Sequence, residues 1–191
     1  MADFRIETER LVLRDWGDGD RDAFYAIMNT PAVMQHLGGV QTAQGWDAAY
    51  LRIAGFTRDF GHTFWILEDL GSGEMLGFCG LKRVNAPGTH DLIGQMEIGW
   101  RLRENAWGKG IAKEAAIASL DLAFGRFAAP HVIAMTTAGN VASQGLMARL
   151  GMARRADLDF TDPRFGPGLN PQMIWRIDAT DWPAARADAS A

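Results

Sequence analysis

The sequence has little cysteine, no long apolar run and no excess of positive charge. Its 191 residues include one cysteine, Cys79, so an intrachain disulfide cannot form, and this fits a reducing compartment. No apolar stretch approaches the roughly 20 residues that a membrane-spanning helix needs. The first residues also lack the basic and apolar segments of a secretion signal. We therefore expect a soluble, cytoplasmic protein with no membrane partner.

The charge balance argues against a nucleic-acid partner. The chain carries 19 Lys and Arg against 23 Asp and Glu, a net charge of −4, whereas nucleic-acid binding through phosphates requires a basic surface. His62, His90 and His131 do not have the spacing of metal ligands, so we expect no metal. Hydrophobic residues make up 48% of the chain, which is enough to build an ordinary globular core.

Hydrophobic periodicity predicts one mixed α/β domain over residues 1–180, followed by a loose, small and Ala-rich tail over 181–191. Three neighbouring strands indicate antiparallel pairing, and a strand–helix–strand unit between residues 96 and 136 indicates a parallel step. Within it, Gly99 suggests a bulge or a close backbone approach. The expected strands cover residues 10–16, 62–69, 74–84, 91–102, 131–137 and 171–178, and the expected helices lie within 18–31, 31–39, 46–53, 108–127 and 140–151.

The stretch "RLRENAWGKGIAKEAA", residues 101–116, places Gly108 and Gly110 between a strand and a helix. A helix begins with free N–H groups and partial positive charge, and glycine lets a ligand approach this backbone closely. Such a junction is typical of a phosphate site. Neighbouring cations add local positive charge to an acidic protein: Arg101, Arg103, Lys109 and Lys113.

Two familiar phosphate motifs do not fit this stretch. A P-loop requires Ser or Thr after its Gly-Lys pair, but Gly110 follows Lys109. A dinucleotide fingerprint requires Gly or Ala where Lys113 stands, and it opens the first strand–helix unit of its fold. From the glycines alone, a simple strand-to-helix turn and a different phosphate site both remain open.

Longer matches resolve this choice. The segment "MEIGWRLRENAWGKGIAKEA" resembles the acetyl-CoA-binding motif of the GNAT acetyltransferase superfamily, R/Q-x-x-G-x-G/A, preceded by its fourth strand. The closest resemblance is to the RimJ/RimL-type branch. Four further segments resemble that branch in the same order, so that the likeness covers roughly residues 5–178: "ETERLVLRDW", "TPAVMQHLGG", "GEMLGFCGL" and "NVASQGLMARLGM".

The resemblance implies a GNAT fold, in which two central parallel strands splay apart in a single mixed sheet flanked by helices, with acetyl-CoA as co-substrate and no metal. The pantetheine arm is then expected along the strand that holds Gly99, and the pyrophosphate on the amides that follow. Asn140, which opens the helix after the fifth strand, is expected near the pantetheine, although a helix cap alone would also explain it. The implied cofactor residues are Ile98, Gly99, Trp100, Arg101, Leu102, Asn105, Ala106, Trp107, Gly108, Lys109, Gly110, Ile111, Ala112, Asn140 and Ser143. Asn105 departs from the Gln or Arg that is usual in the family.

The resemblance also implies two catalytic residues. Glu97 matches an acidic position that often serves as general base, commonly through water, and an ordinary strand carboxylate is the alternative. Ser143 matches a serine near the cofactor sulfur that protonates the leaving thiolate, and a helix serine bonded to its own backbone is the alternative. Met147 occupies the position of a Tyr that many relatives use as the acid, so that route is closed here. His36, in the segment that resembles the substrate-side helices, is a weaker candidate for substrate contact.

The acceptor is expected to be a primary amine. A protein α-amine has a pKa of about 7.7–8.0 and is partly neutral near pH 7, whereas a lysine amine with a pKa of about 10.4 is almost fully charged. This favours a protein or peptide N-terminus, which the RimJ/RimL-type branch acetylates. Small amines such as an antibiotic, a polyamine or an amino acid remain an alternative, as does a non-catalytic acyl-CoA-binding module. A homodimer is one option for the assembly.

Overall fold

The computed structural model describes residues 4–190, which divide into two units. Of these residues, the first unit holds 4–35, 39–82 and 99–116, and the second holds 36–38, 83–98 and 117–190. Strand β5 (Met96–Leu102) and helix α4 (Ile111–Gly125) contribute residues to both. The hydrogen-bonded strand order over the described residues is β1-β2-β3-β4-β5-β6-β8-β7. The expected mixed α/β fold with one sheet is therefore confirmed.

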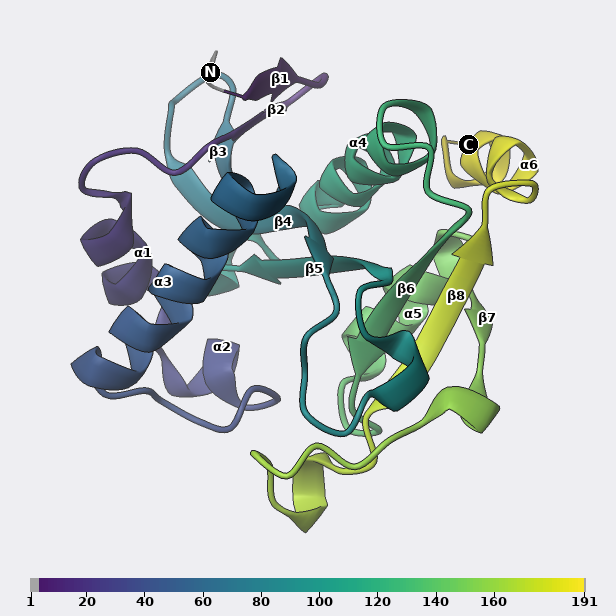
Figure 1. The fold of residues 1–191 in the computed structure, drawn as a ribbon. Coiled ribbons are helices and arrows are strands. Elements are labelled where there is room, and N and C mark those ends of the chain that lie inside the picture. The colour runs from purple at the N-terminus through teal and green to yellow at the C-terminus, as the bar shows by residue number, and fades with distance from the viewer. Residues whose placement is uncertain (1–3, 191) are drawn as a thin grey trace. The chain divides into compact units, whose positions relative to one another are not determined.

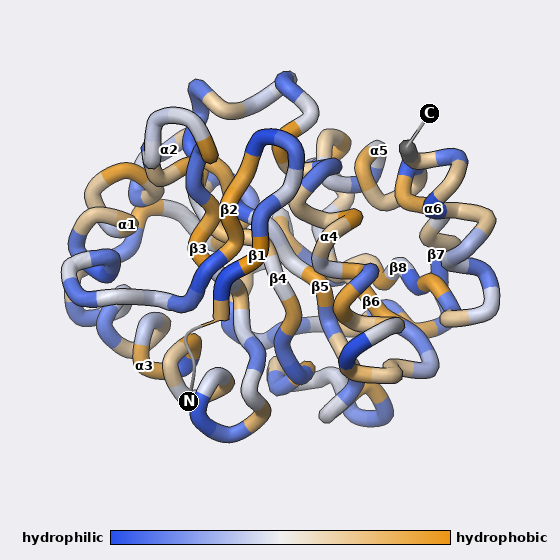
Figure 2. The backbone as a smooth tube through the Cα atoms, turned by 90° about the horizontal axis from the view of Figure 1, so that it is seen from above, coloured by the Kyte–Doolittle hydropathy of each residue, from blue (hydrophilic) through white to orange (hydrophobic). Residues whose placement is uncertain are grey.

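In the first unit, β1 (Arg5–Glu7), β2 (Leu11–Arg14), β3 (Phe64–Asp69) and β4 (Met75–Arg83) pair in sequence order. The pairs β1–β2, β2–β3 and β3–β4 are antiparallel. The short connection between residues 69 and 75 predicts the last of these pairings. Figure 2 shows the apolar character of β2 and β3. Consecutive residues of these strands are buried, so both faces of each strand are covered. A half-exposed strand would instead alternate buried and exposed residues.

Helices α1 (Asp20–Met28), α2 (Pro31–Met34) and α3 (Ala43–Phe60) belong to the first unit, where Figure 1 shows α1 beside α3. Thr42 caps α3 because its side chain accepts a hydrogen bond from the Gly45 N–H, and Gly61 ends the helix in the left-handed conformation. These helices contribute to an aromatic and aliphatic core with β3 and β4: Phe24, Met28, Val33, Trp46, Ile66 and Phe78.

The second unit contains β6 (His131–Thr136), α5 (Val141–Arg149), β7 (Ala153–Arg154) and β8 (Met173–Asp178). Strand β8 lies between β6 and β7 and is antiparallel to both, as Figure 1 shows. The first part of β5 pairs with β6 in parallel, with Glu97 opposite Ile133, which confirms the expected parallel step. The core here comprises Val84, Ala86, Leu92, Ile133, Phe160 and Ile174.

The C-terminal segment differs from the loose tail that its composition suggests. Residues Trp182–Ser190 form helix α6, and Trp182 is buried. The Trp182 ring packs 5.9 Å from the Phe124 ring, and its Nε1 donates to Asp121 Oδ1 at 2.9 Å. An Ala-rich segment is also a good helix former, and burial of one large aromatic side chain stabilises the helix in place.

Candidate functional site

The glycine stretch forms a turn that ends where α4 begins. Gly108 and Gly110 both have positive φ, at 71° and 77°, which glycine adopts without strain. A Cβ built on Gly108 would have no heavy atom of a distant residue within 4 Å. Glycine is therefore required here by backbone conformation, while the space beside its Cα is open. Open backbone ahead of a helix of this length suits an anionic group such as a phosphate.

Two side chains outside the predicted set hold this turn in place. Arg10, just before β2, donates from Nη1 to the Lys109 carbonyl at 3.0 Å, and its Nε pairs with Glu114 Oε2 at 2.7 Å. Glu114 Oε1 also accepts from the Thr8 hydroxyl at 2.5 Å and from the Arg10 N–H at 2.8 Å. The turn is thus tied to the start of β2 and to the first turn of α4.

Electrostatics favours a permanent negative charge on Glu114. Partial burial opposes its ionisation, but the hydrogen bonds from Thr8 and Arg10 outweigh that effect and lower its pKa. Both Arg10 and Glu114 lie inside segments quoted for the family resemblance, yet no local signal assigned them a role. Their sequence separation of 104 residues explains why pattern reasoning missed them.

The strand expected to face the pantetheine is continuous from Met96 to Leu102. A Cβ on Gly99 would lie 2.7 Å from Cζ of Phe64, so glycine is needed because an aromatic ring closely approaches the strand. The sequence suggests a bulge or a close backbone approach at Gly99, and the group that approaches it is the side-chain ring of Phe64. At the end of β5, Trp107 Nε1 donates to the Leu102 carbonyl at 2.8 Å. This contact connects the strand with the glycine turn.

The second unit holds the residues expected to be catalytic. Glu97 is buried, with 8% of its surface exposed. Asn140 caps α5, because its Oδ1 accepts from the Ser143 N–H at 3.2 Å. His36 lies against the turn that precedes this cap, since a Cβ on Gly139 would be 3.5 Å from His36 Cε1. Met147 is buried in α5 and provides no hydroxyl group.

The predicted site residues therefore fall into two sets. The first unit brings together residues 99–112, which include the β5 main chain and the glycine turn. The second unit contains Glu97, Ile98, Asn140, Ser143 and His36, among which His36 lies next to the Asn140 turn.

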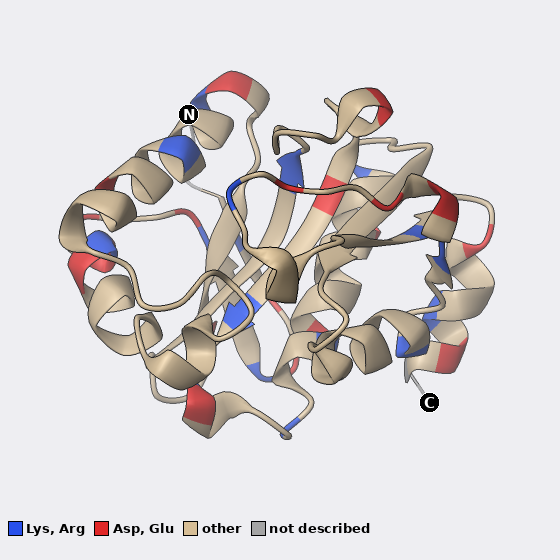
Figure 3. Ribbon diagram, turned by 90° about the horizontal axis from the view of Figure 1, so that it is seen from below, with Lys and Arg blue, Asp and Glu red and all other residues tan. Residues whose placement is uncertain are grey.

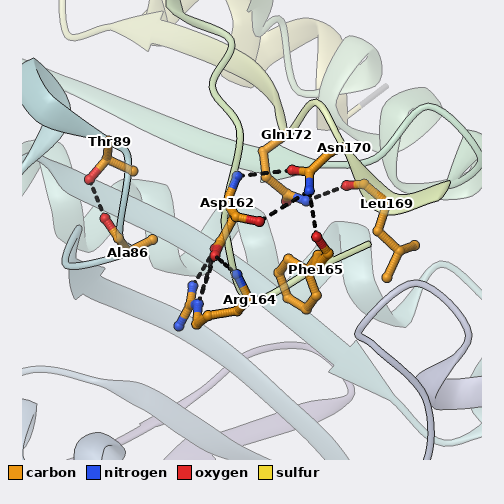
Figure 4. A network of polar contacts seen from close by, with 8 residues as sticks. All are labelled: Ala86, Thr89, Asp162, Arg164, Phe165, Leu169, Asn170 and Gln172. Atoms are coloured by element: carbon orange, nitrogen blue, oxygen red, sulfur yellow. Dashed lines mark hydrogen bonds and ion pairs between the residues drawn. The ribbon is translucent and has the colours of Figure 1, made fainter. Parts of the chain in front are cut away.

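A further polar network in the second unit orders the segment from Thr161 to Gln172 (Figure 4). Asp162, only 1% exposed, accepts from the Arg164 backbone N–H at 3.0 Å and from the Arg164 guanidinium at 2.5 Å. Asn170 Nδ2 donates to the carbonyls of Asp162 and Phe165 at 3.0 and 2.8 Å. The ring of Phe165 lies 3.2 Å from a Cβ position on Gly38.

The charges of this network are mutually stabilised. Burial opposes the ionisation of Asp162, but hydrogen bonds from Arg164 outweigh it and hold the pKa of Asp162 below its ordinary value. The pKa of Arg164 is raised, first by its hydrogen bonds to Asp162 and further by the charges of Asp162 and Glu97. No local pattern in the sequence indicates that Asp162 is buried.

Across residues 4–190, no group of three His, Cys, Asp or Glu side chains could hold a metal. None of the helices formed by these residues is long and apolar enough to cross a membrane. Figure 3 shows acidic and basic residues interspersed along the chain. The open glycine turn remains the feature best matched to the pyrophosphate that the resemblance implies.

Comparison with known proteins agrees with this geometry. The family model described as "Acetyltransferase (GNAT) domain" matches residues 10–153. A curated relative, "Uncharacterized protein YkkB" from Bacillus subtilis, is 31% identical over an alignment of 158 residues that covers 79% of this chain and 86% of the relative.

Solved structures show the same fold. The acetyltransferase from Agrobacterium tumefaciens has a TM-score of 0.75 and 25% identity, covering 91% of this chain and 94% of its own. The ribosomal-protein-S5-alanine acetyltransferase from Vibrio fischeri has a TM-score of 0.70 and 15% identity, covering 94% and 99%. The second likeness concerns the fold alone.

Proposed function

Because the chain belongs to the GNAT acetyltransferase family, we propose that it transfers acetyl from acetyl-CoA directly to a primary amine. The single observation that carries the proposal is the turn of Gly108 and Gly110 ahead of α4. Both residues have positive φ, and the space beside Gly108 is open. Arg10 and Glu114 hold this turn rigidly, so its amides are preorganised for a pyrophosphate.

In this proposal the β5 main chain binds the cofactor arm and the glycine turn binds its phosphates. The N–H and carbonyl groups of Ile98–Leu102 pair with the pantetheine amides as a neighbouring strand would. The amides between Asn105 and Ala112 take the pyrophosphate, so the side chain of Asn105 matters less than its backbone. Asn140 supplies a further polar group from the start of α5. The bound acetyl-CoA supplies a thioester, a good acyl donor with a moderate leaving group.

The catalytic roles follow from the chemistry of acyl transfer. The amine nitrogen must be neutral to attack the thioester carbon, and Glu97 accepts its proton, directly or through water. A backbone N–H near Gly99 stabilises the developing oxyanion. Ser143 donates a proton to the departing sulfur, a role that an ordinary thiol pKa of about 8.5 makes helpful but not essential. Buried Met147 excludes a tyrosine in that role.

For the acceptor we propose a protein or peptide N-terminus, as in the RimJ/RimL-type branch. The lower pKa of an α-amine supports this choice, because a site with one carboxylate base gains most from an amine that is already partly neutral. His36 is the candidate for substrate contact, since it lies beside the turn before Asn140. A small amine acceptor stands as the alternative within the same chemistry.

We also propose that the catalytic domain extends over residues 1–180.

A non-catalytic acyl-CoA-binding module is the second candidate, and Met147 favours it because the usual tyrosine acid is replaced. The two candidates differ in turnover. The full chain should be mixed with acetyl-CoA and a library of peptides and small amines, with thiol release followed by colour and products by mass. We expect release with at least one class of amine. Thermal stabilisation by acetyl-CoA without release from any amine would reject the enzyme and support the binding module.

A further inference from the structure

A guanidinium on β5 has no acidic partner among the described residues. Arg101 lies with its Cζ 5.2 Å from the centre of the Phe78 ring, and its Nε is shielded from solvent without a hydrogen-bond partner. None of the ion pairs formed by residues 4–190 includes Arg101. A buried hydrogen-bond donor of a charged group costs free energy when it has no partner. The position of Arg101 is therefore poorly explained by a contribution to the stability of the fold.

The surroundings of Arg101 are aromatic and positive. Phe78 stacks on Phe64 with ring centres 4.8 Å apart and on Phe24 at 5.4 Å. Lys82 Nζ lies 5.8 Å from the centre of the Phe64 ring. The π electrons of an aromatic ring attract a cation that lies over its face. A carboxylate that forms charge-assisted hydrogen bonds with a guanidinium in a poorly hydrated place binds it more strongly.

Arg101 also lies close to the position expected for the thioester. Gly99 and Arg101 are two residues apart on β5 and so share one face, with Cα atoms about 7 Å apart. The face is the one that Phe64 covers at Gly99. Desolvation lowers the pKa of Arg101 to about 10, which leaves the guanidinium charged near neutral pH. A small acceptor bound beside the β5 main chain could therefore reach the positive charge of Arg101.

We propose that Arg101 is a specificity-determining residue that binds a carboxylate of the acceptor. This inference rests on the proposed acetyl transfer to an amine. The planar guanidinium matches a carboxylate through two parallel hydrogen bonds. Arg101 as a whole is half-buried, and its terminal nitrogens Nη1 and Nη2 supply such a pair. A single guanidinium balances one carboxylate, whereas a phosphate carries nearly two charges and usually requires more donors. The acceptor class is thus an α-amine that bears a nearby carboxylate.

The carboxylate could be the C-terminus of a short peptide or an acidic side chain near the N-terminus of a long one, and the experiment separates these two sources. One pair of acceptors is the dipeptide Ala-Ala and its C-terminal amide, which tests a terminal carboxylate. The other pair is a long peptide that begins Ala-Asp and its Ala-Asn counterpart, which tests an acidic side chain. We expect the carboxylate form to have a kcat/KM higher by about tenfold or more in one of the two pairs, as a charge-assisted bond predicts.

The variants assign that preference to Arg101. Arg101→Gln should reduce the ratio within the preferred pair to near one, and Arg101→Lys should keep part of it, because a point charge cannot make the forked contact. Arg103→Gln is the matched control: this nearby arginine is paired with Glu74, so the ratio should not change. Acetyl-CoA affinity and thermal unfolding are measured for every variant.

Each outcome is decisive. A purely structural role for Arg101 would lower the rates of both members of a pair equally and leave their ratio unchanged, which would overturn the proposal. Equal rates within both pairs in the wild-type protein would overturn it as well, even where Arg101→Gln does not fold. If no amine releases thiol from acetyl-CoA, the proposed function itself fails, which is a different result from release at equal rates.

Discussion

Arg10 and Glu114 are joined by a side-chain ion pair of 2.7 Å and by a hydrogen bond from the Arg10 backbone N–H to the same carboxylate. The pair connects the start of β2 with the first turn of α4, although the residues are 104 positions apart. The same arginine reaches the Lys109 carbonyl in the glycine turn. The shape of the proposed phosphate site therefore depends on a contact between the two ends of the first unit's sequence.

Removal of the Glu114 charge should loosen the glycine turn. For Glu114→Gln we expect a loss of about 1–2 kcal/mol in the free energy of unfolding, since Arg10 and Thr8 lose a charged acceptor. Acetyl-CoA should bind several-fold more weakly. Urea unfolding and calorimetric titration measure the two effects. Asp59→Asn is the control, because Asp59 forms an exposed pair with its neighbour Arg58. Unchanged acetyl-CoA affinity in Glu114→Gln would show that the contact between Arg10 and Glu114 does not contribute to cofactor binding.

A negative side chain in the glycine turn should weaken cofactor binding. In Gly108→Glu, the carboxylate occupies the open space beside the turn and repels the pyrophosphate, so we expect affinity to fall by about tenfold or more. Gly73→Glu is closely matched, because Gly73 has the same φ of 71° and equally open surroundings. Both variants carry the same backbone strain. Equal acetyl-CoA affinities of the two variants, measured by titration calorimetry, would refute the phosphate assignment.

The base assignment predicts a change in rate without a change in cofactor affinity. Glu97→Gln should lower kcat by about 100-fold, within the range for loss of a general base, with acetyl-CoA affinity unchanged. Steady-state kinetics and titration calorimetry provide the measurements. Glu74→Gln serves as control, because Glu74 is exposed and lies on the hairpin of the first unit. A wild-type kcat in Glu97→Gln would assign the base to another group or to water.

The serine at the start of α5 should affect leaving-group departure more than binding. Ser143→Ala keeps the N–H that Asn140 caps, so the helix start should be preserved. We expect kcat to fall by about tenfold, at the low end for assistance by a general acid, with acetyl-CoA affinity unchanged. Ser72→Ala in the β3–β4 loop is the control. If kcat of Ser143→Ala equals that of the wild type, water or another group protonates the sulfur.

The buried carboxylate of Asp162 predicts a pH-dependent stability. Its pKa is lowered in the folded state, so its contribution is fully present above the ordinary value near 3.8 and is lost as pH falls through the folded pKa. Asp162→Asn should cost about 2 kcal/mol at pH 7, because Arg164 loses a buried charged partner.

Urea unfolding at several pH values tests this statement. The stability difference between the wild type and Asp162→Asn should shrink as the medium becomes more acidic than the ordinary Asp range. Asp188→Asn, on the exposed side of α6, should show little effect at any pH. A difference for Asp162→Asn that is independent of pH would indicate that packing, and not charge, makes Asp162 important.

Much of the site could be predicted from the sequence because its determinants are local. Gly108 and Gly110 adopt positive φ through the conformational freedom of glycine, and Asn140 caps α5 through a bond to a residue three positions later. Hydrophobic periodicity likewise gave the antiparallel β3–β4 pair and the parallel β5–β6 step. Such features require only neighbouring residues, so a linear pattern contains them.

Other features were decided by the tertiary structure alone. Pairing of Arg10 with Glu114, the position of Arg101 over Phe78 and the burial of Asp162 join residues whose proximity depends on how strands and loops pack. Composition described the C-terminal segment as loose, but burial of Trp182 made it helix α6. Long-range contacts carry no periodic or local signal. The sequence by itself therefore determined the fold class and the glycine turn, and packing decided which charges surround them.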